Sequence, residues 1–228
     1  IKFMDIGKEF ESYYTKHLGK GSLDLYYMNQ RIESSMTPYI LEEREMRATQ
    51  IDIFSRLMRD RLLWVAGPVD DRMSIVVQAQ LMFLENSDKT DITMHIDSPG
   101  GSVKSGLSMV DVMQYISCDI RTVNTGMAAS MGSVLLGAGT KGKRSSLKFS
   151  KTMLHQTSGG AGGNIQDARI NFIEWEKTNK ILFDLLGDFC GKTPEQVIED
   201  AERDFWLSAE EAVEYGIIDE IVKTKKKG

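Results

Sequence analysis

The chain has 228 residues, a formal net charge of −5 at neutral pH and 41% hydrophobic residues, enough apolar content for one sizeable core. Its acidic and basic residues are interspersed and no apolar run approaches membrane-spanning length, so we expect neither a nucleic-acid nor a membrane partner. The two cysteines, Cys118 and Cys190, are too few for a disulfide framework and lack metal-ligand spacing, which favours a cytoplasmic protein without metal or other cofactor.

The first 35 residues carry mixed charges without the apolar core of a signal peptide. They also lack the arginine-rich, acid-poor composition of a transit sequence. Two interpretations stay open for this segment: a prosegment that is cleaved off, or a permanently attached arm.

The central region alternates short apolar strands with amphipathic helices. The pattern predicts strands over 62–67, 91–96 and 119–124, and helices over 73–84, 103–116 and from Ser130 onward. This alternation predicts an α/β fold with helices packed on mostly parallel strands. The segments IDSPGG (96–101) and GMAASMG (126–132) fall where a strand gives way to a helix, which is the usual place for ligands in such folds.

The segment from Asn164 to about Phe189 has apolar residues at helical spacing and predicts one long helix. A helix of about 26 residues spans about 39 Å, more than a small globule needs, so we expect part of it to project toward a partner subunit. Further on, Thr193 and Ser208 begin capping patterns of two short helices. Asp204 is expected in the turn between them.

Ser130 lies in a segment of small residues at the predicted start of a helix. The first N–H groups of a helix have no internal partner, so a negative oxygen that forms there is stabilised. The serine is therefore a candidate nucleophile. A helix cap is an equally good interpretation of the heptapeptide alone, because serine is common at helix N-termini.

A nucleophilic serine needs a base, and histidine is the usual one. The chain has three histidines: His17, His95 and His155. His155 is the best placed, because it ends an apolar run just before the glycine-rich segment SGGAGG and so lies where a strand opens into a loop. The carboxylate that would orient it cannot be chosen by spacing among 33 acidic residues.

Four motifs in one register then resemble the proteolytic subunit of the Clp protease family, a much stronger signal than a lone serine pattern. They are IDSPGG, GMAASMG, MLHQ (153–156) and ERD (202–204) followed by LSAEEAVEYG. The resemblance runs from about Met36 to about Val222. It implies a crotonase-like α/β fold of repeated β-α-β units with a projecting handle helix. It also implies a serine endopeptidase.

The resemblance also implies individual roles. Ser130 corresponds to the nucleophile, His155 to the general base and Asp204 to the orienting carboxylate. Gly101 and Met131 correspond to the residues whose backbone N–H groups form the oxyanion hole, and such donors are worth roughly 3 to 4 kcal/mol of barrier each.

Assembly and partners are implied in the same way. The family forms homo-oligomers of two stacked heptameric rings, which receive unfolded polypeptides from an AAA+ Clp unfoldase. Phe83 and Tyr115 correspond to residues of the pocket that docks the unfoldase, whereas Thr93 and His95 occupy positions where aromatic residues are usual. Arg203 corresponds to an arginine that links neighbouring subunits.

The resemblance divides the chain into an N-terminal extension, residues 1–35, and a single peptidase domain, residues 36–228. We expect the extension to be a self-cleaved prosegment. The chain departs from the family pattern at Thr157, where proline is usual, and at Asn164, where glutamine is usual. Both departures concern the stiffness of the loop after the histidine.

Other functions are compatible with parts of this pattern. An acyl-CoA hydratase or isomerase would share the fold and a two-amide oxyanion hole, but would not need Ser130, His155 and Asp204 together. A non-catalytic ring subunit would be expected to lack at least one of the three. A membrane-bound protease of similar fold would use a serine and lysine pair with an anchoring helix, which the sequence lacks.

Overall fold

The computed structural model describes residues 39–44, 47–157 and 164–223. The chain divides into two compact units, with the boundary between Arg56 and Leu57. In the first unit, β1 (Tyr39–Arg44) and β2 (Arg47–Asp52) pair antiparallel. The boundary between the units falls within the helix that follows them, α3 (Ile53–Arg59). The expected end of the N-terminal extension at residue 35 lies outside the described residues.

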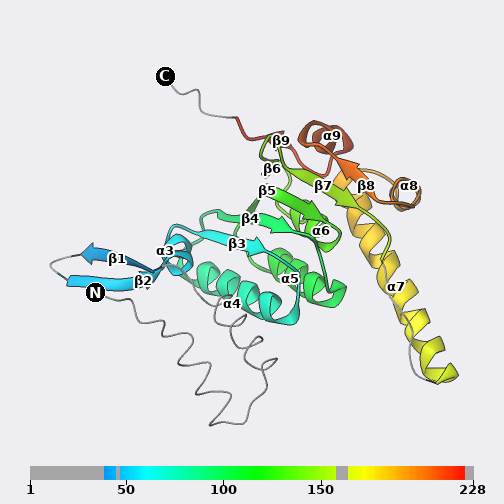
Figure 1. Cartoon of the computed structure of the whole chain (residues 1–228), viewed down its shortest axis with the longest axis horizontal. Coiled ribbons are helices and arrows are strands. Elements are labelled where there is room, and N and C mark those ends of the chain that lie inside the picture. The colour runs from blue at the N-terminus through cyan, green and yellow to red at the C-terminus, as the bar shows by residue number, and fades with distance from the viewer. Residues whose placement is uncertain (1–38, 45–46, 158–163, 224–228) are drawn as a thin grey trace, which may run out of the picture. The chain divides into compact units, whose positions relative to one another are not determined.

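The second unit is built on a seven-stranded sheet (Figure 1). Its main path runs through β3 (Leu62–Ala66), β4 (Ile92–Ser98), β5 (Ile120–Ala129), β6 (Arg144–Ser146) and β9 (Glu220–Ile221), all in parallel pairs. β5 is ten residues long, so its first half pairs with β6 and its second half with β7 (Lys151–Leu154). The predicted mostly parallel α/β fold is confirmed.

Helices α4 (Asp71–Ser87) and α5 (Val103–Tyr115) are the crossovers between β3, β4 and β5. They lie where the sequence predicts them and pack against each other (Figure 1). α6 (Met131–Gly137) is buried along its whole length. On β4 the fully buried Ile92, Met94 and Ile96 alternate with more exposed residues. Period-two burial of this kind places the core on one face of the sheet.

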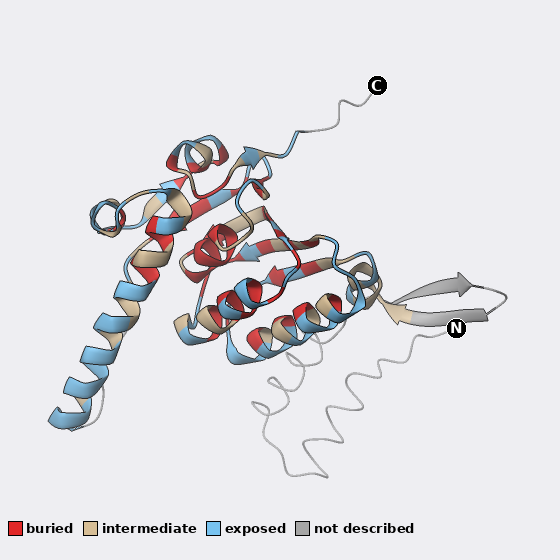
Figure 2. Ribbon diagram, turned by 180° about the vertical axis from the view of Figure 1, so that it is seen from behind, coloured by how far each residue is buried: buried red, intermediate tan, exposed pale blue. Residues whose placement is uncertain are grey.

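The long helix α7 (Ile165–Cys190) confirms the prediction of a projecting handle. Asn164 caps its start by accepting hydrogen bonds from the first-turn N–H groups, and Gly191 ends it in the left-handed conformation with φ 68°. Only residues from Leu182 onward are buried. The N-terminal part extends away from the sheet with exposed side chains (Figure 2).

The C-terminal region contains a strand that the sequence pattern did not predict. α8 (Pro194–Asp200) and α9 (Ala209–Tyr215) begin after their expected caps, Thr193 and Ser208. Between them lies β8 (Phe205–Leu207), which pairs antiparallel with β7. Asp204 therefore immediately precedes a strand. Across the described ranges, no helix combines the length and the apolar character needed to cross a membrane.

Candidate active site

Ser130 lies between the last residue of β5 and the first residue of α6, in a backbone conformation with φ 54° and ψ −122°. A positive φ is uncommon for a non-glycine residue and stores on the order of 1 to 3 kcal/mol of strain. The Ser130 N–H donates to the Met153 carbonyl oxygen at 2.9 Å, which ties the turn to β7. The Ser130 hydroxyl caps no backbone N–H. Its geometry therefore argues against the helix-cap interpretation and leaves the oxygen available for chemistry.

Two glycines follow β4, and the first of them, Gly100, is pressed against this turn. A Cβ on Gly100 would lie 2.6 Å from the Ser130 Cβ and 2.9 Å from the Met131 nitrogen, and the residue has φ 90°. A Cβ on Gly101 would lie 2.3 Å from the Val69 carbonyl oxygen, at φ 152°. Both the space and the backbone conformation therefore require glycine. The family resemblance singled out Gly101, whereas Gly100 was missed.

The backbone N–H groups of Gly101 and Met131 are the expected oxyanion donors. Within the described part of the chain, neither N–H donates a hydrogen bond. The Met131 N–H belongs to the first turn of α6, where no intrahelical partner exists. Both residues line the same pocket as Ser130. Free N–H donors in a pocket with a free hydroxyl suit the stabilisation of a negative oxygen.

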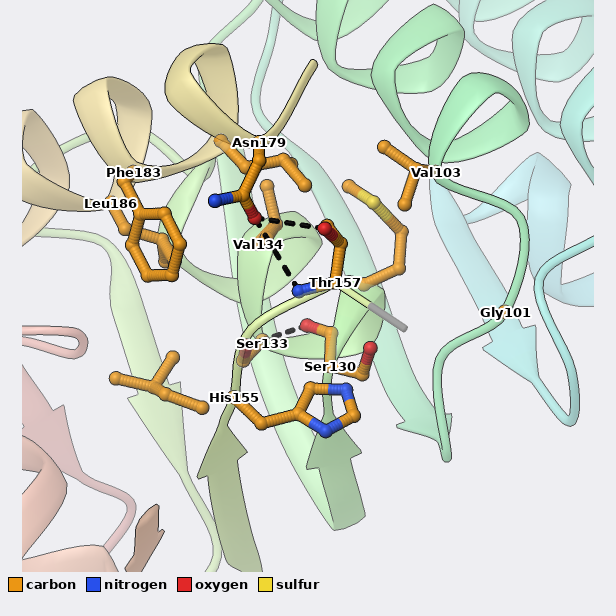
Figure 3. Close-up of a pocket in the computed structure, with 13 residues that line it drawn as sticks. Gly101, Val103, Ser130, Ser133, Val134, His155, Thr157, Asn179, Phe183 and Leu186 are labelled. Carbon is orange, nitrogen blue, oxygen red and sulfur yellow. Dashed lines mark hydrogen bonds between the residues drawn. The ribbon is translucent and has the colours of Figure 1, made fainter. Parts of the chain in front are cut away.

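His155 directly follows β7 and lines this pocket with Ser130. Figure 3 shows the Ser130 side chain next to the imidazole. Of the other two histidines, His17 lies outside the described residues. His95 lies in β4, stacks on Trp64 with ring centroids 4.7 Å apart and does not line the pocket. His155 is therefore the histidine that the structure brings to Ser130.

The register of β7 and β8 explains how Asp204 reaches His155. Leu154 is the partner of Phe205, and the next pair in this antiparallel register is His155 opposite Asp204. Asp204 Oδ1 lies 3.4 Å from His155 Nδ1, and the Asp204 side chain is 63% exposed. This distance is longer than an ordinary hydrogen bond. Catalytic hydrogen bonds are often loose before substrate binds, so the arrangement can orient the base.

The pocket continues from the serine into an apolar recess beneath α7 (Figure 3). Apolar side chains from four elements form its wall: Val103, Val134, Leu154, Leu182, Phe183 and Leu186. Ser133, Thr157 and Asn179 supply polar groups. The sequence pattern assigned α7 to packing and subunit contact, and missed its contribution to this pocket. The apolar residues at helical spacing in α7 are visible in the sequence. Their spacing alone does not show which part of the protein they pack against.

The other predicted functional residues lie away from the pocket. Arg203 is exposed beside Asp204 and forms no ion pair among the residues described. Phe83 of α4 and Tyr115 at the end of α5 are 60% and 80% exposed, respectively. Large apolar side chains at such exposure are available for contact with another protein.

Comparison with known proteins identifies the family. The family model described as Clp protease matches residues 43–225. The chain belongs to the Clp protease family. It is accordingly a peptidase of the serine type with the crotonase-like fold, and neither the hydratase nor the non-catalytic alternative is favoured.

Several relatives match nearly the whole chain and are named ATP-dependent Clp protease proteolytic subunit, and two of them serve as examples. The protein of Bacteroides fragilis is 46% identical over 95% of this chain and 99% of its own length. That of Porphyromonas gingivalis is 46% identical over 96% of this chain and 99% of its own length. A Streptococcus gordonii protein of the same name is also 46% identical, but over 82% of this chain and 97% of its own length.

Proposed function

We propose that this Clp family member hydrolyses peptide bonds with Ser130 as nucleophile, His155 as general base and Asp204 as the carboxylate that orients the base. The observation that carries the proposal is the free Ser130 hydroxyl, which shares a pocket with an imidazole whose Nδ1 lies 3.4 Å from Asp204. A hydroxyl needs such a base because it is a weak nucleophile at neutral pH.

In the first step, His155 Nε2 takes the Ser130 proton while Oγ attacks the carbonyl carbon of the substrate. Asp204 at Nδ1 holds the tautomer that leaves Nε2 free to accept and stabilises the imidazolium. The carbonyl oxygen becomes negative and accepts hydrogen bonds from the Gly101 and Met131 N–H groups. His155 then gives its proton to the leaving amine, and an acyl-enzyme forms on Ser130.

In the second step, His155 takes a proton from water, which attacks the acyl carbon. The same two N–H groups stabilise the second tetrahedral intermediate, and the proton returns to Ser130 Oγ as the acid product leaves. Every proton in this cycle passes through one imidazole. The scheme needs no metal or other cofactor.

We also infer that the chain acts as a homo-oligomer of two stacked heptameric rings, to which an AAA+ Clp unfoldase delivers unfolded protein. The projecting α7 offers a surface for ring contact, and the exposed Phe83 and Tyr115 offer apolar side chains for the unfoldase. The name ATP-dependent Clp protease proteolytic subunit, carried by the relatives, supports the ATP-driven partner. The free thiols of Cys118 and Cys190 suit the cytoplasm.

We propose that residues 1–35 are a prosegment that the assembled enzyme removes, leaving a single peptidase domain from residue 36. The alignment with the Porphyromonas protein covers 96% of the chain and therefore extends into this segment. The intact mass of the active enzyme should lack the segment, whereas Ser130→Ala should retain it. An identical, unshortened mass for both proteins would contradict self-cleavage.

The test of the catalytic assignment compares Ser130→Ala with Ser108→Ala. Ser108 is a half-buried serine of α5 that does not line the pocket, and its hydroxyl donates to the Lys104 carbonyl oxygen. Hydrolysis of a fluorogenic peptide should fall about 10⁴-fold or more in Ser130→Ala and should be unchanged in Ser108→Ala. Casein should be degraded only when an unfoldase and ATP are added to an enzyme with Ser130 intact. Full peptide hydrolysis by Ser130→Ala would refute the proposal.

A further inference from the structure

Three side chains tie the chain just after His155 to the long helix α7. The Trp175 indole N–H donates to the Thr157 hydroxyl oxygen at 2.6 Å, and that hydroxyl donates to Asn179 Oδ1 at 2.8 Å. The Thr157 backbone N–H also points to Asn179 Oδ1, at 3.4 Å (Figure 3). We call Thr157, Trp175 and Asn179 the α7 clamp.

The protons in the α7 clamp can be assigned from the chemistry of the groups. An indole nitrogen only donates, so the Thr157 oxygen must accept from Trp175. The single Thr157 hydroxyl proton is then directed to Asn179, whose oxygen must face the loop to accept it. One hydroxyl therefore accepts from Trp175 and donates to Asn179 at the same time. Among side chains of this size, only those of threonine and serine carry a hydroxyl that can do both.

The α7 clamp is the first firm attachment of the chain after β7. The strand pairing ends with Leu154 opposite Phe205, so His155 and Gln156 lie between the last pair of the sheet and Thr157. The contact of His155 with Asp204 is 3.4 Å long and its carboxylate is 63% exposed. Such an exposed contact is a weak restraint. The position of the imidazole therefore depends on how residues 155–156 are held at both ends, by the strand pairing at Leu154 and by the α7 clamp at Thr157.

We propose that Thr157 is a positioning residue for His155: held by Trp175 and Asn179, it fixes the segment that aims the imidazole at Ser130. The inference rests on the proposed function, because it assigns His155 the role of base. It also gives α7 a second role besides subunit contact. Three hydrogen bonds join residues 175–179 of α7 to Thr157, so a movement of this part of α7 would shift His155. A hydrogen-bonding threonine thus supplies a restraint at the position where the family usually has the stiff proline.

The test measures kcat and KM for a short peptide in four full-length variants. Thr157→Val removes the hydroxyl at nearly constant volume, and we expect kcat to fall tenfold to a hundredfold, on the order of the loss from a small misplacement of a catalytic group. KM should change less than threefold. Thr157→Ser should restore kcat to within threefold of the parent. Trp175→Phe, which removes one donor, should give a smaller loss of kcat than Thr157→Val.

The matched control is Thr178→Val. Thr178 lies on the same helix and donates to the Glu174 carbonyl oxygen at 2.8 Å, so this variant loses a threonine hydrogen bond that does not reach the loop. Its kcat should equal that of the parent. The inference would be overturned if Thr157→Val changed KM alone, if Thr157→Ser failed to restore kcat, or if Thr178→Val lost as much activity.

Two further measurements keep the result interpretable. If Thr157→Val does not fold, as judged by its thermal unfolding, the comparison of Thr157→Ser and Trp175→Phe with the parent decides the question, because each keeps most of the side chain. Ser130→Ala in the same assay tests the proposed function separately. Normal kcat in Trp175→Phe together with an inactive Ser130→Ala would reject the α7 clamp while leaving the catalytic assignment intact.

Discussion

The two halves of the candidate active site are built in different ways. The nucleophile half is a closely packed turn, where the strained Ser130 backbone is pressed against Gly100 and tied to β7. The base half consists of His155 at a strand end and Asp204, whose side chain is 63% exposed and 3.4 Å away. Close packing of backbone against backbone fixes the first half, whereas a few side-chain contacts fix the second.

The proposed mechanism explains why the nucleophile half is more rigid than the base half. The oxyanion donors must be in place before charge develops, because a preorganised donor has no reorganisation cost at the moment of reaction. In the proposed mechanism His155 carries a proton from Ser130 to the leaving amine, so a limited freedom of the imidazole is tolerated. We therefore expect steric changes in the nucleophile half to cost more activity than single hydrogen-bond changes in the base half.

The largest effect within this comparison is expected for Gly100→Ala. The new Cβ would overlap the Ser130 Cβ at 2.6 Å and the Met131 nitrogen at 2.9 Å, so either the serine or the oxyanion donor must shift. Peptide hydrolysis should fall about 10²- to 10³-fold, as for loss of one oxyanion donor.

The control for that variant is Gly142→Ala. Gly142 has nearly the same φ as Gly100, 86° against 90°, but a Cβ added to Gly142 would meet no atom within 4 Å. The control variant therefore shares the backbone strain and lacks the overlap. Equal losses of activity in the two variants would show that general strain, and not contact with Ser130, is responsible.

A smaller effect is expected for Asp204→Asn. In serine proteases with a buried carboxylate this change costs about 10⁴-fold, because the amide favours the wrong tautomer of the base. Asp204 is 63% exposed, so water can partly replace it, and we expect a loss of about 10²-fold. The exposed neighbour Glu202 provides the control, since Glu202→Gln removes a carboxylate that does not contact His155. A loss of 10⁴-fold would show that the base half is as rigid as the nucleophile half.

The smallest effect is expected for His95→Phe, which changes how the free energy of unfolding depends on pH. Because His95 lies outside the pocket, this variant tests the effect of acid on stability and not on the catalytic step. Burial lowers the pKa of His95, so the unfolded chain binds a proton more readily than the folded chain. Stability is then complete above the ordinary pKa of about 6.5 and falls as the pH drops below it. His95→Phe keeps a ring against Trp64 and removes this titration. Its free energy of unfolding, measured in urea, should fall less between about pH 7 and 5 than that of the parent; an equal fall would contradict the burial argument.

The sequence predicted the elements whose determinants are local. IDSPGG and GMAASMG placed two turns at strand ends, and apolar spacing placed α7 to within a residue or two of its observed limits. The candidate nucleophile, Ser130, followed from the same local chemistry. These features depend on residues close together in the chain, so their pattern is visible without a structure.

The base half could not be predicted in this way. His155 faces Asp204 because β7 and β8 pair in one register across about fifty residues of chain, and a slip of one residue would turn Asp204 to the other face. β8 itself has only three residues, too short for a periodic signal. The hydrogen bond that Thr157 accepts from Trp175 and the one that it donates to Asn179 likewise depend on how α7 packs. Only the family resemblance pointed to Asp204.

The most direct measurement is to label the enzyme with a serine-directed phosphonate and map the modified peptide by mass spectrometry. The reagent forms a stable adduct with a serine only where a base activates the hydroxyl and N–H donors hold the phosphonyl oxygen. We expect a single adduct on Ser130, slower labelling in Asp204→Asn and none in Ser130→Ala. An adduct on another residue, or undiminished labelling of Ser130→Ala, would contradict the assignment of Ser130 as the nucleophile.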